Sequence, residues 1–119
     1  MLTAPTRLVT NGDMAGDITS SVQQLDNAFG YSVQAVYTGS SIAGVISLEA
    51  SVNHRQDDQG NVSVAGDWVA VLNSAQTLSA AGSYIWNIAD SMYPYFRVKY
   101  AHHADDSGVL NVWSFVRGF

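Results

Sequence analysis

The chain has 119 residues, of which 47% are hydrophobic and only 13% are charged, and its formal net charge is −5 at pH 7. This length suits one domain with its own core, while the low charge content indicates a neutral, hydrogen-bonding surface. The acidic balance argues against nucleic-acid and anionic-membrane partners, and the lack of cysteine excludes disulfides and thiolate chemistry.

Short segments that alternate apolar and polar residues, separated by glycine-rich and polar turns, predict about eight β-strands. In chain order they are residues 6–10, 17–25, 31–39, 44–52, 67–73, 83–89, 95–101 and 109–116. The clearest is 44–52, where one face has Ile46, Leu48, Ala50 and Val52 and the other has Ser47, Glu49 and Ser51. In the same way, one face of 31–39 has Tyr31, Val33, Ala35 and Tyr37, and one face of 95–101 has Phe96, Val98 and Tyr100. Such alternation is typical of a strand with one face on a core and one face in water.

This succession of strands predicts an all-β fold, namely a single antiparallel β-sandwich of jelly-roll type over residues 1–119. Residues 1–16 are a candidate for an extended N-terminal segment. The segment 67–73 is expected to be a strand with apolar residues on both faces. Two segments, 20–28 and 84–92, also carry apolar residues at helical spacing, so a short helix stays open at each.

Two loops share the pattern H-x-x-D-D-x-G. The first has His54, Asp57, Asp58 and Gly60, and the second has His102, Asp105, Asp106 and Gly108. Aspartate accepts hydrogen bonds from backbone amides two residues on, and glycine adopts positive φ, so the pattern predicts the same turn used twice. The second loop is expected to close a hairpin between 95–101 and 109–116.

The functional alternative for these loops is a divalent cation site. The weak candidate ligands are Asp57, Asp58, His102, Asp105 and Asp106. Calcium takes six to eight oxygen ligands, and neither loop has the regularly spaced ligands of an EF-hand. No metal or other cofactor is therefore expected, and Ca²⁺ remains the minor alternative.

No catalytic constellation is visible in the sequence. There is no G-x-S-x-G elbow and no glycine-rich phosphate loop, and Glu49, the one glutamate, lies on the wet face of a predicted strand. The sequence therefore predicts a protein that is not an enzyme. A metal-dependent hydrolase is the third and weakest alternative.

Thirteen aromatic residues suggest a binding surface. The candidates for a subunit interface or for a glycan-binding platform are Trp86, Tyr93, Tyr95, Arg97 and Trp113. The predicted hairpin would place Tyr95 and Trp113 on paired strands, where with Tyr93 they would form a flat platform for sugar rings. The alternative is that these aromatic side chains fill the core or a subunit interface.

One sequence of motifs gives the chain a resemblance to a known class of proteins. It consists of a Q-x-x-x-T-G strand with Gln34, Thr38 and Gly39; a strand with Ser47, Leu48 and Ser51; a strand led by Trp68; an R-V-x-Y strand with Arg97, Val98 and Tyr100; and a turn with Ser107 and Gly108. Over residues 17–119 this order resembles small β-sandwich virion proteins of bacteriophages. The chain departs from it in the long connection 52–66.

The resemblance implies a non-enzymatic virion structural protein that decorates a capsid, forms a spike or vertex, or joins head and tail. It implies synthesis in the host cytoplasm, location in the virion, and binding to other virion proteins. A homo-oligomer is expected, with a trimer as one option. The runner-up is a carbohydrate-binding β-sandwich module that recognises a receptor or a glycan.

Overall fold

The computed structural model describes residues 5–25, 28–89 and 92–118. Within these ranges it contains twelve strands: β1 Thr6–Asp13, β2 Ile18–Thr19, β3 Gln23–Gln24, β4 Ala28–Ser41, β5 Val45–Ser51, β6 Arg55–Gln56, β7 Val62–Val64, β8 Val69–Ala70, β9 Gln76–Thr77, β10 Gly82–Ile88, β11 Tyr95–Ala101 and β12 Ser107–Gly118. The predicted all-β class is confirmed. The helical alternatives are wrong for the described parts of 20–28 and 84–92, where the backbone is extended or irregular. No helix in the described ranges is long and apolar enough to cross a membrane.

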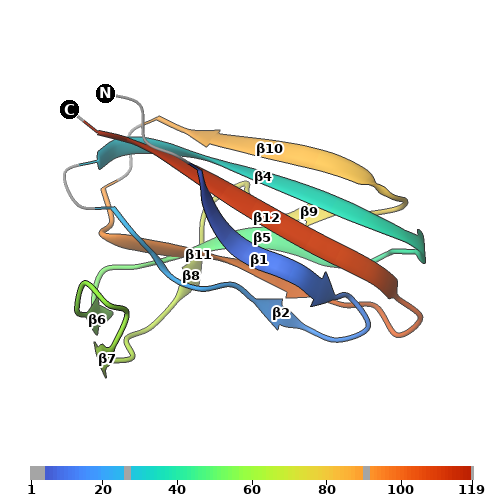
Figure 1. Ribbon diagram of the computed structural model, residues 1–119, viewed down its shortest axis with the longest axis horizontal. Helices are drawn as coiled ribbons and strands as arrows, with labels where there is room; N and C mark the ends of the chain where they lie inside the picture. The colour runs from blue at the N-terminus through green and yellow to red at the C-terminus, as the bar shows by residue number, and fades with distance from the viewer. Residues whose placement is uncertain (1–4, 26–27, 90–91, 119) are drawn as a thin grey trace.

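Ten of these strands form two antiparallel sheets packed face to face (Figure 1). The first sheet has the order β1-β12-β4-β10. The second has the order β2-β11-β5-β8, with β3 also paired to β11 and β9 also paired to β5. If β2 with β3 and β8 with β9 each count as one strand, the eight positions pair as 1-8-3-6 and 2-7-4-5, which is the strand order of a jelly roll. The count rises from about eight to twelve because two edge strands are split and β6 and β7 form a separate hairpin.

The core lies between the inward faces of the two sheets. The core residues of β4 are Tyr31, Val33, Ala35 and Tyr37, and those of β11 are Phe96, Val98 and Tyr100. These are the alternating residues that the sequence placed on one face, so that part of the prediction is confirmed. The ring of Tyr31 stacks on that of Phe96, with centroids 3.9 Å apart, and this contact joins β4 of one sheet to β11 of the other.

The segment 67–73 departs from its predicted strand. Only Val69–Ala70 pairs with β5, and the side chains of Val69 and Leu72 are 69% and 87% exposed. Between β8 and β9 the ladder is interrupted by Ser74, whose hydroxyl accepts a hydrogen bond from Leu48 N and donates one to Leu48 O. At Leu48, in the middle of β5, the Ser74 hydroxyl and Val71 N therefore take the place of a paired strand.

The predicted hairpin between β11 and β12 is wrong, because these strands lie in different sheets. The loop after Ala101 crosses from the second sheet to the first, as the jelly-roll order requires. Gly108 does not close a hairpin turn but faces Gly39 of β4, at an irregularity in the pairing of β4 with β12. A Cβ on Gly108 would lie 2.4 Å from Thr38 O, and one on Gly39 would lie 2.4 Å from Ser107 O. Only glycine allows this close approach.

Candidate functional site

The outward face of the second sheet is partly covered by residues 52–68, which we call the arm and which include the β6–β7 hairpin (Figure 1). His54 of the arm is buried, and its ring lies edge-on to Tyr95 with centroids 4.8 Å apart. The ring of Trp68, at the far end of the arm, lies 5.2 Å from that of His54. Both ring nitrogens of His54 have hydrogen-bond partners, Ala65 O and Gln56 Oε1. The arm thus shields Tyr95, which is only 6% exposed.

Arg97, next on the outward face of β11, is also held by contacts within the chain. Its guanidinium lies 4.3 Å from the ring centre of Trp68, and its Nε donates to Glu49 Oε1 at 2.8 Å. Both side chains of this ion pair are about one-fifth exposed. Stacking on an aromatic ring and pairing with a carboxylate is a structural role that suits arginine. The Arg97 side chain is therefore held by Trp68 of the arm and Glu49 of β5.

The expected aromatic platform is not formed. Tyr95 lies under the arm on the second sheet, whereas Trp113 lies on the outward face of the first sheet, on the opposite side of the sandwich. The hydroxyl of Tyr93 is 2.5 Å from that of Tyr31, so the two hydroxyl groups are hydrogen-bonded to each other within the protein. Burial, together with this contact, raises the pKa of Tyr31 above its ordinary value. The three rings therefore do not share a surface.

Trp86 belongs to the core. Its side chain is 5% exposed, and its indole nitrogen donates to Ser74 O at 2.8 Å. The ring of Tyr84 meets it edge-on at 4.9 Å. Of the five candidate binding residues, only Trp113 presents its side chain on an open groove of the first sheet, as described below.

The first H-x-x-D-D-x-G loop is an exposed turn between β6 and β7. Asp57 accepts hydrogen bonds from the backbone nitrogens of Gln59 and Asn61 and from Asn61 Nδ2. The Asn61 bonds, ahead of the others, lower the pKa of Asp57 below its ordinary value. Gly60 follows at a φ of 86°, in the left-handed region that favours glycine. The predicted turn chemistry is confirmed for this loop.

In the second loop the hydrogen bonds are made by the second aspartate of the pattern, Asp106, which is buried. Asp106 accepts hydrogen bonds from Ala43 N, from His103 N and from the hydroxyl of Tyr100. Burial by itself would raise the pKa of Asp106, but these hydrogen bonds outweigh it and lower the pKa. The loops therefore share a sequence pattern without sharing a turn, and the prediction of one turn used twice is wrong.

The candidate cation ligands do not converge. No group of three or more His, Asp or Glu side chains that could hold a metal occurs among the residues that the structure describes. The carboxylates of Asp57 and Asp106 accept the hydrogen bonds given above, and His102 Nδ1 lies 2.6 Å from Asp17 Oδ1. Asp58 and Asp105 are exposed on separate loops.

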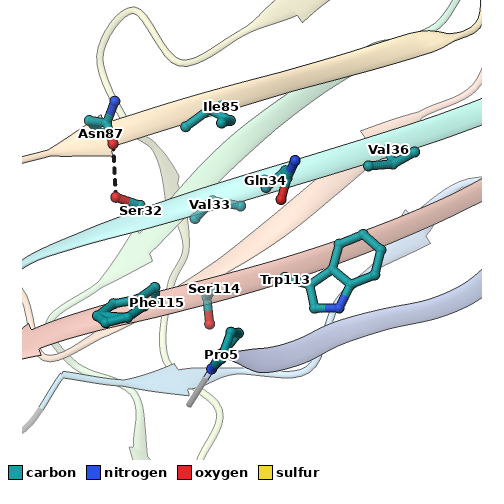
Figure 2. Close-up of a pocket in the computed structure, with 10 residues that line it drawn as sticks. All are labelled: Pro5, Ser32, Val33, Gln34, Val36, Ile85, Asn87, Trp113, Ser114 and Phe115. Atoms are coloured by element: carbon teal, nitrogen blue, oxygen red, sulfur yellow. Dashed lines mark hydrogen bonds between the residues drawn. The ribbon is translucent and has the colours of Figure 1, made fainter. Parts of the chain in front are cut away.

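A groove of about 650 Å³ lies on the outward face of the first sheet. Figure 2 shows its floor, formed by side chains of β4, β10 and β12. One row runs across all four strands, because Arg7 pairs with Trp113, Trp113 with Gln34, and Gln34 with Ile85. The guanidinium of Arg7 lies 4.3 Å from the ring centre of Trp113.

A second row of the groove runs beside the first. Phe115 of β12 pairs with Ser32 of β4, which pairs with Asn87 of β10. The Ser32 hydroxyl donates to Asn87 Oδ1 at 2.8 Å (Figure 2). The described residues that line the groove have no ionisable side chain, and the guanidinium of Arg7 lies at its edge, over Trp113. The groove therefore offers aromatic and apolar surface together with neutral hydrogen-bonding groups.

A second groove, of about 560 Å³, lies beside β8. Its lining includes the exposed Val52, Val69 and Leu72, together with Tyr93. Val52 is 67% exposed because β5 ends at Ser51, so the predicted inward position of Val52 is wrong.

The amino-acid sequence matches no protein-family model and no curated protein. Sequence reasoning identified Trp113 but missed its neighbours Gln34, Ile85 and Asn87 as parts of one groove. Alternation within 31–39 and 83–89 does place these side chains on one side of each strand. The pairing register that brings them together follows from the strand order, which a single sequence does not display.

Proposed function

We propose that the protein is a non-enzymatic structural component of a bacteriophage virion, such as a capsid decoration, spike, vertex or head–tail part. It would act by self-association and by binding other virion proteins. The resemblance over residues 17–119 supports this proposal, and so does the jelly-roll strand order, which viral capsid domains use. Because one fold serves many functions, the proposed function depends more on the surface of the protein than on its fold.

The observation that carries the proposal is the open face of the first sheet. The arm covers Tyr95 and Arg97 on the other sheet's outer surface, whereas this face exposes a groove with Trp113, Phe115 and Ile85 on it and with Arg7 as the one charged side chain at its edge among the described residues that the groove's strand pairing aligns. Protein interfaces are depleted in charged residues at their centres and enriched in aromatic ones. The groove also lacks an ionisable lining residue within the described ranges, which supports a contact surface rather than a catalytic centre.

The test measures how much of the protein is incorporated into phage particles. The particles are purified on a density gradient from the culture that carries the gene. We expect the protein to sediment with the major coat protein at a fixed ratio. Gln34→Arg puts an unpaired charge in the groove and is expected to lower incorporation at least about tenfold. Thr38→Arg is the matched control, because Thr38 is exposed on the same strand but does not line the groove.

The result that contradicts the proposal is a protein that is expressed and folded during infection but is absent from the particle fraction. Equal incorporation of the Gln34→Arg and Thr38→Arg proteins would keep the virion location but reject the groove as the contact surface. Circular dichroism of both variants shows whether each one is folded.

A second candidate function is glycan binding at the same groove. Gln34, Asn87 and Ser32 offer amide and hydroxyl groups beside the indole of Trp113, which is a combination that suits neutral sugars. On an array of neutral oligosaccharides of glucose, galactose and N-acetylglucosamine, we expect Trp113→Ala to lower any binding about tenfold or more. Binding that Trp113→Ala leaves unchanged, or no binding by the unaltered protein, contradicts this candidate.

A further inference from the structure

β10 is an edge strand, and neither its sequence nor its pairing with the described strands shows the usual protections against further pairing. In the first sheet it pairs only with β4 among the described strands, so its other edge has no partner strand there. The pairing of β10 with β4 is regular over all seven residues from Gly82 to Ile88. Its sequence, GSYIWNI, contains no proline and no charged residue. Natural proteins usually block such edges with lysine, proline, bulges or very short strands.

The other edges of the sandwich carry those protections. β1 has two irregularities in its pairing and carries Arg7 and Asp13. β2, β3, β8 and β9 have two residues each. No second long and regular edge is therefore present, among the described strands, to accept β10 of another copy in a head-to-tail contact. β10 fits best against another β10.

We propose that two copies of the chain pair through β10, antiparallel about a two-fold axis at Ile85, so that their first sheets join into one eight-stranded sheet. This inference rests on the proposed self-association and assigns it a surface. A two-fold contact uses the same patch on both copies and closes at two. The unpaired backbone groups of each edge supply the hydrogen bonds.

The side chains of β10 are complementary in this register. Residue 85 is the middle of the strand, so a two-fold axis there aligns all seven residues of both copies. On the outward face Ile85 meets Ile85 of the second copy, and Ser83 meets Asn87. The Ser83–Asn87 pair repeats between copies the hydroxyl–amide contact that Ser32 and Asn87 already make within one chain. No like charges meet, because β10 has none.

Single cysteines test the register, because the chain has no cysteine of its own. In Ile85→Cys the two cysteines face each other with Cα atoms about 4.5–5.5 Å apart, within disulfide range. In Ser83→Cys, the matched control on the same face of the same strand, they lie about 14 Å apart. After mild oxidation we expect Ile85→Cys to migrate at twice the 12.8 kDa of one chain on a non-reducing gel, and Ser83→Cys to migrate as one chain.

The mass in solution, from size-exclusion chromatography with light scattering over a dilution series, is the second measurement. The unaltered protein is expected at two chains. Ile85→Lys puts two like charges at the axis and is expected to yield one chain, whereas Val109→Lys, on the same face but two strands from the edge, is expected to stay at two.

A monomer or a trimer for the unaltered protein overturns the inference, and so does equal cross-linking of Ile85→Cys and Ser83→Cys. A cross-link from position 85 to a different coat protein would assign the edge to that protein instead. These failures differ from failure of the proposed function. Monomers that still sediment with particles reject only the pairing, and dimers absent from particles reject only the virion location.

Discussion

Replacing Trp86 by alanine is expected to lower the free energy of unfolding by about 3–5 kcal/mol, the usual cost of removing a large buried aromatic side chain. Trp86 is 5% exposed, so the substitution leaves a cavity between the sheets. It also leaves Ser74 O without the donor that now lies 2.8 Å away. Urea denaturation followed by circular dichroism measures the change.

Trp113→Ala is the matched control for this prediction. Its ring is half-buried on the outward face, where truncation opens no cavity in the core. We expect a loss of about 1 kcal/mol or less. Comparable losses for the two variants, with an unchanged slope against urea concentration, would contradict the assignment of Trp86 to the core and Trp113 to the surface.

Asp106→Asn is expected to lower the melting temperature by about 10 °C, because one of the backbone donors around this buried side chain loses its acceptor. Asp106 accepts from two backbone nitrogens, those of Ala43 and His103, through its two oxygens. An asparagine in either orientation points an amide donor at one of them. Asp57→Asn is the matched control, because Asp57 stands in the same sequence pattern but on an exposed turn. Its melting temperature is expected to fall by less than about 3 °C.

The Asp106 carboxylate also makes the stability of the protein depend on pH. Because its pKa in the folded protein lies below the ordinary value, Asp106 binds a proton more readily in the unfolded chain. Its contribution is therefore complete above about pH 5 and is lost as the pH falls through about 4 and below. Melting temperatures measured from pH 7 to pH 2 are expected to fall less steeply for Asp106→Asn than for the unaltered protein. Parallel curves would contradict this role for Asp106.

The alternation of side chains was enough to predict the fold class and the inward faces. β4 and β11 have apolar residues at every second position because one face of each strand meets the opposite sheet, so Val33 and Val98 could be placed in the core from sequence. The same rule failed for residues 67–73. Val69 and Leu72 of this segment are exposed, because the segment pairs with β5 only at Val69–Ala70 and Ser74 hydrogen-bonds Leu48 beyond it.

The candidate site was less predictable, because it depends on connections between strands. A short polar loop with glycine can close a hairpin or cross to the other sheet, and the residues after Ala101 permit both. The predicted hairpin would have placed Tyr95 beside Trp113. Because the chain crosses to the other sheet instead, the expected aromatic platform is not formed. The burial of Tyr95 depends in turn on the folded-back arm, a long-range contact for which the local sequence around Tyr95 contains no signal.

The position of β12 between β1 and β4 sets the order of events during synthesis. Thr6 of β1 pairs with Ser114 of β12 and Asp13 with Val109, so the first strand has no neighbour in its sheet until about a hundred further residues have been translated. At about 5–20 residues per second, that interval lasts about 5–20 s. The first sheet therefore closes only late in translation or after it, and until then the edges of β1 and β4 are open to chaperones and to other nascent chains on the same polysome.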